Sequence, residues 1–158
     1  MTRVALVPGV LALLPRYAGL VDPVADLRAA CLGAVGWLGE EVTVLADQQG
    51  GRVAAHLLAV THRSHPERSF LVVGNGSARR DERAPGHLDE SAFRFDRDLF
   101  SWLSGDGPPL DLELGDRMLA SMTGFALLAE RVPSRGRPEV DYDDDPFGVQ
   151  YWVMRWHG

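Results

Sequence analysis

The sequence predicts an α/β protein with a mostly parallel sheet, helices flanking that sheet, and a C-terminal antiparallel hairpin. Short apolar runs alternate with longer segments whose apolar residues recur at three- and four-residue steps, the pattern of strands and crossover helices. Near the C-terminus, two alternating segments flank an acidic turn that contains proline and glycine. With 158 residues, 46% hydrophobic and 24% charged, residues 1–158 fit a single domain.

The first strand is expected at Val4–Val7, an apolar run that Pro8 and Gly9 end with a turn. A helix is then expected to begin at Asp22-Pro23, with aspartate as the N-cap and proline in the first helical position. Gly39 ends this helix. One apolar face runs along it, formed by Leu27, Ala30, Cys31, Ala34, Val35 and Leu38.

The middle of the chain predicts two more strands with a helix between them. Val42–Ala46 is β-branched and apolar, and a loop at Gln48–Gly51 is expected to follow it. Val53–Thr61 predicts a helix, and Phe70–Val73 predicts the third strand. A long polar loop, Gly74–Gly86, comes directly after this third strand.

The last third predicts helices and then the hairpin. One helix is expected at Leu88–Leu103, and Leu110–Arg131 is expected to form two helical pieces divided near Gly115. Val140–Tyr142 and Val149–Val153 then alternate around the acidic turn, as the two strands of a hairpin do.

Composition excludes several classes of function. The formal net charge of −6 argues against a nucleic-acid binder, which needs a basic face. No window approaches the roughly 20 continuous apolar residues of a membrane span, and the N-terminal segment lacks a cleavage site of the secretory kind. We therefore expect a cytoplasmic protein. The single cysteine, Cys31, lies in an apolar helical stretch and is expected to be a buried structural residue.

The candidate ligand-binding residues follow the expected strands. Ligands of parallel α/β sheets bind beyond the carboxyl ends of the strands, so the loops at those ends are expected to converge. The candidates are Gly9, Asp47, Asn75, Ser77, Arg79, Arg80 and Asp143. No serine, histidine and aspartate have a spacing that indicates a catalytic triad, and no catalytic residue is assigned.

Two interpretations of the loop after Phe70–Val73 stay open. Its glycine amides, with Arg79 and Arg80, could hold a carboxylate or a phosphate. Alternatively, the loop is a tight turn whose arginines pair with neighbouring acids or with the acidic turn. A dinucleotide site is disfavoured because Arg79 stands where the last glycine of the G-x-G-x-x-G motif is needed.

Three histidines are weaker candidates for a metal site. His62 and His65 are three residues apart, a spacing that metal ligands use on helices, and His56 precedes them. Pro66 follows directly, which favours a solvated helix end for this pair, and the apolar neighbours of His56 favour a partly buried structural residue. A metal site would require these histidines to meet Asp47 or the acidic turn.

The order of four segments resembles a known family. VALVPGVLALLPRYAG, DLRAACLGAVGWL, FLVVGNGSARRDERAPGHLDESAFRFD and EVDYDDDPFGVQYWV are similar to short proteins from GC-rich bacteria that resemble the B-type subunit of class III extradiol ring-cleavage dioxygenases. The resemblance covers most of the chain. It also implies that this chain is shortened around residues 46–52, after the second strand.

The resemblance implies an iron site that this sequence does not complete. Active enzymes of the superfamily hold Fe(II) with two histidines and a glutamate, which leave open positions for catechol and O₂. Gly9 and Asp47 stand where the two histidines are expected, and the region of Ser77 stands where an acid/base histidine is expected. The carboxylate region corresponds to Glu139 or to Asp141–Asp145.

The sequence therefore favours a non-catalytic protein that binds a small anionic or aromatic ligand, or that supports a partner as a subunit. No cofactor is expected. The alternative is a metal-dependent enzyme, such as a non-haem Fe(II) dioxygenase or a hydrolase, with a rearranged site. A homodimer is a further hypothesis, because Trp152 and Trp156, if exposed on an edge strand, would indicate strand pairing across an interface. Packing of this pair under the helices is the favoured alternative.

Overall fold

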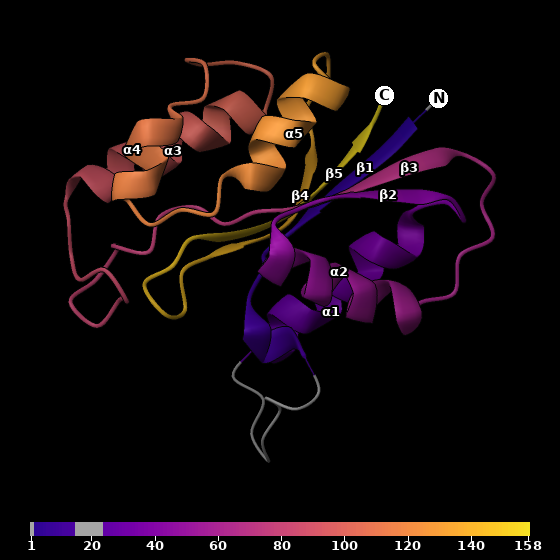
Figure 1. Ribbon diagram of the computed structural model, residues 1–158, viewed down its shortest axis with the longest axis horizontal. Coiled ribbons are helices and arrows are strands. Elements are labelled where there is room, and N and C mark those ends of the chain that lie inside the picture. Colours follow the sequence, from indigo (N-terminus) through magenta and orange to yellow (C-terminus); the bar gives the residue numbers. More distant parts are fainter. Residues whose placement is uncertain (1, 15–23) are drawn as a thin grey trace.

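The computed structural model describes residues 2–14 and 24–158, which form a three-layer α/β arrangement (Figure 1). A five-stranded sheet has α1 and α2 on one face and α3, α4 and α5 on the other. The strands are β1 Thr2–Val7, β2 Val42–Leu45, β3 Arg68–Val73, β4 Glu139–Asp144 and β5 Tyr151–His157. The helices are η1 Leu11–Leu13, α1 Ala25–Trp37, α2 Gln48–Ala59, α3 Ser91–Leu103, α4 Leu112–Arg117 and α5 Thr123–Arg131.

The sheet is mixed, so the expectation of a mostly parallel sheet was wrong. Its strand order is β2-β3-β1-β5-β4. The pairs β2–β3 and β1–β3 are parallel, whereas β1–β5 and β5–β4 are antiparallel. The hairpin of β4 and β5 was correctly expected, but its second strand also joins the sheet directly beside β1.

Burial explains why β5 occupies the inner position of the hairpin. The side chains of β5 are almost all buried, whereas β4 carries acidic residues and is mostly exposed. Placing the apolar strand inside removes its surface from water, and charges on the outer strand discourage pairing with another chain. Trp152 and Trp156 are therefore buried in the core. The favoured interpretation, that this pair packs under the helices, is confirmed, and the alternative of exposure on an edge strand was wrong.

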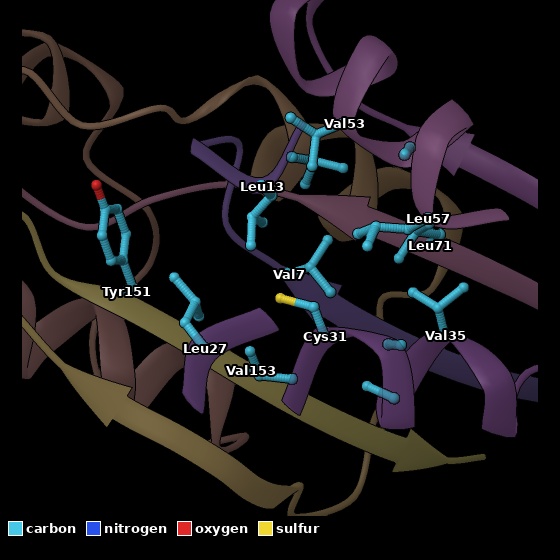
Figure 2. Packing of buried hydrophobic residues seen from close by; sticks show 14 of the residues in the cluster. Val7, Leu13, Leu27, Cys31, Val35, Val53, Leu57, Leu71, Tyr151 and Val153 are labelled. Carbon is cyan, nitrogen blue, oxygen red and sulfur yellow. The ribbon is translucent and has the colours of Figure 1, made fainter. Parts of the chain in front are cut away.

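Two apolar clusters hold the layers together. One lies between the sheet and α1 and α2, and the other between the sheet and the helices of the opposite face. Figure 2 shows the first cluster, in which Cys31 lies near Val7 and Leu27. Burial raises the pKa of the Cys31 thiol to about 12. Cys31 is thus an apolar packing residue, as the sequence predicted.

Helix α2 begins earlier than the sequence indicated. Gln48–Gly51 was expected to be a loop, but it forms the first turn of α2, with Asp47 as the N-cap. The carboxylate of Asp47 accepts a 2.7 Å hydrogen bond from the amide of Gly50. A Cβ atom at Gly50 would lie 2.9 Å from Cγ1 of Val73, so glycine lets the helix start close against β3.

One further boundary differs from expectation, and another cannot be compared with the structure. Gly115 lies inside α4, where a Cβ atom would lie 2.6 Å from Cγ of Met122, and the break between α4 and α5 falls at residues 118–122. The expected helix start at Asp22-Pro23 lies outside the described residues. Within the part of the chain that the structure describes, no helix is long and apolar enough to cross a membrane.

Candidate functional site at the carboxyl edge of the sheet

The loop after β3 continues the sheet across the end of β1. The amide of Gly74 donates a 3.1 Å hydrogen bond to the carbonyl of Val7, the last residue of β1. The next residues then pair with Gln150, which precedes β5: Gly76 donates to its carbonyl at 2.9 Å, and its amide donates to the carbonyl of Ser77 at 2.9 Å. The loop therefore takes the place of β1 beside β5 once β1 has turned away.

The opposite side of this loop is also hydrogen-bonded to the protein. Asn75 and Ser121 exchange two backbone hydrogen bonds of 3.2 and 3.3 Å, and the amide of Ala78 donates to the connection between α4 and α5 at 2.9 Å. The amide of Arg80 donates to the carbonyl of Gly148 at 3.0 Å. An anion held by these amides would have to displace bonds that the fold already makes.

Ser77 and Arg80 converge on Asp96, a residue of α3. The amide and hydroxyl of Ser77 donate to the two carboxylate oxygens of Asp96 at 2.7 and 2.6 Å. The guanidinium of Arg80 donates to Asp96 at 3.0 Å and to Asp145 at 2.7 Å. Arg80 thus pairs with the acidic turn, as one of the two interpretations of this loop predicts. Its second partner, Asp96, was not predicted from the sequence.

Burial and ion pairing oppose each other in this network. Asp96 is only 3% exposed, and burial raises the pKa of its carboxyl, although the bonds from Ser77 and Arg80 partly offset this effect. For Arg80, burial lowers the pKa, but the hydrogen bonds and charges of Asp145 and Asp96 outweigh it and raise the pKa overall. The guanidinium also lies 4.6 Å from the ring centroid of Phe93. The network locks the loop to α3 and to the acidic turn.

Arg79 differs from its neighbour. Its Nε atom is buried without a hydrogen-bond partner, and no ion pair of its side chain is found among the described residues. Unlike Arg80, Arg79 therefore has a charge that no carboxylate matches in the part of the chain that the structure describes.

Gly9 is held from both sides by amide side chains. Its N–H donates a 2.8 Å hydrogen bond to Oδ1 of Asn75, and its carbonyl accepts a 2.7 Å hydrogen bond from Nε2 of Gln49. A Cβ atom at Gly9 would lie 3.1 Å from Cγ1 of Val73 and 3.6 Å from Cα of Gly50. This position has little room for a larger side chain without movement of its neighbours.

Asp47 lies at the same edge, next to a small polar cavity. One of its carboxylate oxygens caps α2, and the other accepts a 3.3 Å hydrogen bond from the hydroxyl of Ser121. Asp47, Asp116, Ser121 and Thr123 contribute to the lining of this cavity of about 180 Å³. Ser121 thus connects Asp47 to Asn75, which in turn accepts the hydrogen bond from Gly9.

Asp143 lies on the other side, near β5. Its carboxylate accepts a 2.7 Å hydrogen bond from Nε2 of Gln150, and together with Arg80 and Asp96 it lines a shallow hollow of about 260 Å³. Six of the seven predicted site residues, all except Arg79, therefore form two groups. Gly9, Asp47 and Asn75 gather around Ser121, whereas Ser77, Arg80 and Asp143 gather around Asp96 and Gln150.

The three candidate histidines lie away from this edge. His56 is in the last turn of α2, and the exposed His62 follows that helix. The ring of His65 contacts Arg3 at 2.9 Å, near the start of β1 and thus at the opposite end of the sheet. Among residues 2–14 and 24–158, no group of three or more His, Cys, Asp and Glu side chains is placed to hold a metal ion.

A larger cavity of about 570 Å³ lies between α3 and the segment that leads into α4. It shares Leu112 and Met122 with the small polar cavity beside Asp47. Apolar side chains provide most of its lining, including Leu99, Trp102 and Leu114. A small molecule bound here would therefore lie close to the carboxyl edge of the sheet.

No protein-family model matches this chain, and no curated protein matches it significantly.

Proposed function

We propose that this protein is a non-catalytic relative of the class III extradiol ring-cleavage dioxygenases. One observation carries the proposal. Gly9 and Asp47 stand where the resemblance expects the two iron-binding histidines, and the hydrogen bonds of both residues serve the fold. Glycine has no side-chain donor, and Asp47 is already an N-cap.

The chemistry of ring cleavage needs groups that this edge lacks. A non-haem Fe(II) site uses two neutral imidazoles and a carboxylate on one face of the metal. The residue near the expected acid/base position is Ser77, whose hydroxyl donates to Asp96. A hydroxyl is a weak proton carrier at neutral pH, because its pKa lies far from that pH. The positions of His56, His62 and His65 give the alternative of a rearranged metal site no support.

The role that remains is binding, of a small ligand or of a partner in an assembly in the cytoplasm. The cavity between α3 and α4 supports the first of these roles, because its 570 Å³ lies within the usual range for small-molecule sites. Sedimentation of the purified protein tests the second role, since a homodimer or a complex with another protein differs in mass from the single chain.

An oxygen-consumption assay tests the loss of ring cleavage. The protein is incubated with Fe(II) under anaerobic conditions, freed of unbound metal, and then mixed with catechol in aerated buffer. We expect no oxygen uptake above that of the same protein treated with a chelator. Catalytic turnover of catechol with consumption of one O₂ for each ring cleaved would contradict the proposal.

A further inference from the structure

The cavity between α3 and α4, called the groove below, has a mainly apolar lining that also includes two carboxylates. Its apolar lining includes Phe95, Leu99, Trp102, Leu110, Leu114 and Met122, which come from α3, from the segment before α4, from α4 itself and from the N-cap of α5. Such a lining favours a ligand with a flat apolar ring, because burying ring carbons removes their surface from water.

Trp102 is an aromatic wall of the groove whose ring contacts two other side chains. Its ring makes an edge contact with Phe125 at a centroid distance of 6.5 Å, and the guanidinium of Arg135 lies 4.5 Å from its centroid. Arg135 lines a separate cavity with Asp106, whereas Trp102 lines both that cavity and the groove. The indole is thus fixed by other groups, and part of it remains available to a ligand.

The charge of the groove has one sign. Asp98 and Asp111 line it, and no basic side chain of the described residues does so. Asp111 uses Oδ1 to cap α4 through a 3.0 Å bond from the amide of Leu114. The carboxylate of Asp98, a residue of α3, has no hydrogen-bond or ion-pair partner among the described residues. Two carboxylates beside an apolar surface repel an anionic ligand and attract an ammonium group.

We propose that this groove binds a small aromatic compound that carries a positively charged amine. The inference rests on the small-ligand role proposed above and specifies the chemical class of the ligand. Of the two ligand classes that the sequence favours, aromatic and anionic, this groove suits the aromatic one, because its lining is apolar and its charged side chains are acidic. The ring lies against Trp102, and the ammonium group lies near Asp98 and Asp111.

Three probes with the same indole ring separate the effect of charge from the effect of the ring. Tryptamine carries an ammonium group, tryptophol a neutral hydroxyl and indole-3-acetate a carboxylate. Isothermal titration calorimetry at low ionic strength is expected to show the tightest binding for tryptamine and the weakest for indole-3-acetate. Added salt should weaken tryptamine binding and leave tryptophol binding almost unchanged. Equal binding of the three probes, or binding of none, would overturn the proposal.

Substitutions of the two groove aspartates test whether tryptamine binds in this groove. Asp98→Asn with Asp111→Asn removes both charges and keeps a good N-cap at position 111, and it should weaken tryptamine binding by about fivefold for each carboxylate. The control Glu130→Gln removes a charge from exposed surface outside the groove and should change nothing. Unchanged tryptamine binding in the double variant would refute the assignment.

A further variant, which fills space in the groove, tests the site if the double variant does not fold. Leu112 is 51% exposed and lines the groove, so Leu112→Trp should fold and should weaken binding of all three probes by filling the space. Unchanged binding in this variant would place the ligand elsewhere and overturn the inference. The calorimetry does not depend on iron. Failure of the probes to bind would therefore leave the non-catalytic proposal intact, and iron-dependent turnover of catechol would leave the measured tryptamine binding intact.

Discussion

The amide of Gly9 donates a 2.8 Å hydrogen bond to the side-chain oxygen of Asn75, although 66 residues separate the two positions in the chain. This bond ties the turn after β1 to the loop after β3. Gln49 closes the same turn from the α2 side. The edge of the sheet at which ligands of α/β proteins usually bind is here closed by the protein's own amides.

Replacing Asn75 with alanine should lower the free energy of unfolding by about 1–2 kcal/mol, because the buried amide of Gly9 loses its acceptor. Urea denaturation measures this change. Gln48→Ala is the control, since Gln48 is exposed, and it should change stability by less than about 0.5 kcal/mol. Equal effects of the two variants would show that the Asn75 bond does not secure the edge.

Ser77→Ala should destabilise the protein by about 1–3 kcal/mol, because the buried carboxylate of Asp96 loses a hydroxyl donor at 2.6 Å. The comparison variant is Ser91→Ala, whose side chain is exposed at the start of α3. Chemical denaturation of both variants measures the difference. A Ser77→Ala protein as stable as the Ser91→Ala protein would remove the structural role assigned to this serine.

Asp96 should give stability a particular dependence on pH. Burial raises its pKa in the folded protein above the ordinary value of 3.8, so the folded state binds a proton more tightly than the unfolded state does. The stability that this group contributes is therefore fully present below pH 3.8. It is lost as the pH rises through the raised pKa of the folded state.

The Asp96→Asn variant isolates this effect, because its other titrating groups are the same. The free energy of unfolding of the unaltered protein minus that of Asp96→Asn should fall as the pH rises above 3.8 and should then level off. Denaturation of both proteins at a series of pH values measures this difference. A difference that rises with pH would mean that the bonds from Ser77 and Arg80 outweigh burial.

Much of the fold could be predicted from the sequence, because each strand has its own apolar pattern. The strand β3 and the hairpin of β4 and β5 follow directly from local periodicity. The position of β5 between β1 and β4 does not, since it depends on how completely each strand is buried. The start of α2 was missed because Gly50 and Gly51 indicate a loop, whereas the contact with Val73 that favours glycine is long-range.

The candidate site was less predictable than the fold. The sequence placed Gly9, Asp47 and Asn75 at one edge, but it could not show that Ser121 and Gln49 would bond to them. One feature of the sequence could have indicated Asp96, the acidic residue that the sequence analysis missed. Asp96 lies four residues after Ala92 and three before Leu99 on the apolar face of α3, and an acid on such a face needs a buried partner.

Cys31 should resist modification in the folded protein. Its thiol is buried, and burial raises its pKa to about 12, so the reactive thiolate is scarce at neutral pH. An iodoacetamide time course followed by mass spectrometry is expected to show slow labelling in buffer and rapid labelling in urea. Equally rapid labelling under both conditions would mean that α1 opens readily from the sheet.

The central proposal is that the carboxyl edge of this sheet does not hold iron. Native mass spectrometry after anaerobic incubation with Fe(II) and removal of unbound metal tests it most directly. The account predicts the mass of the metal-free chain, because Gly9 and Asp47 do not provide the two imidazoles that the site needs. A stable species with one iron for each chain, lost on mutation of Asp47, would contradict it.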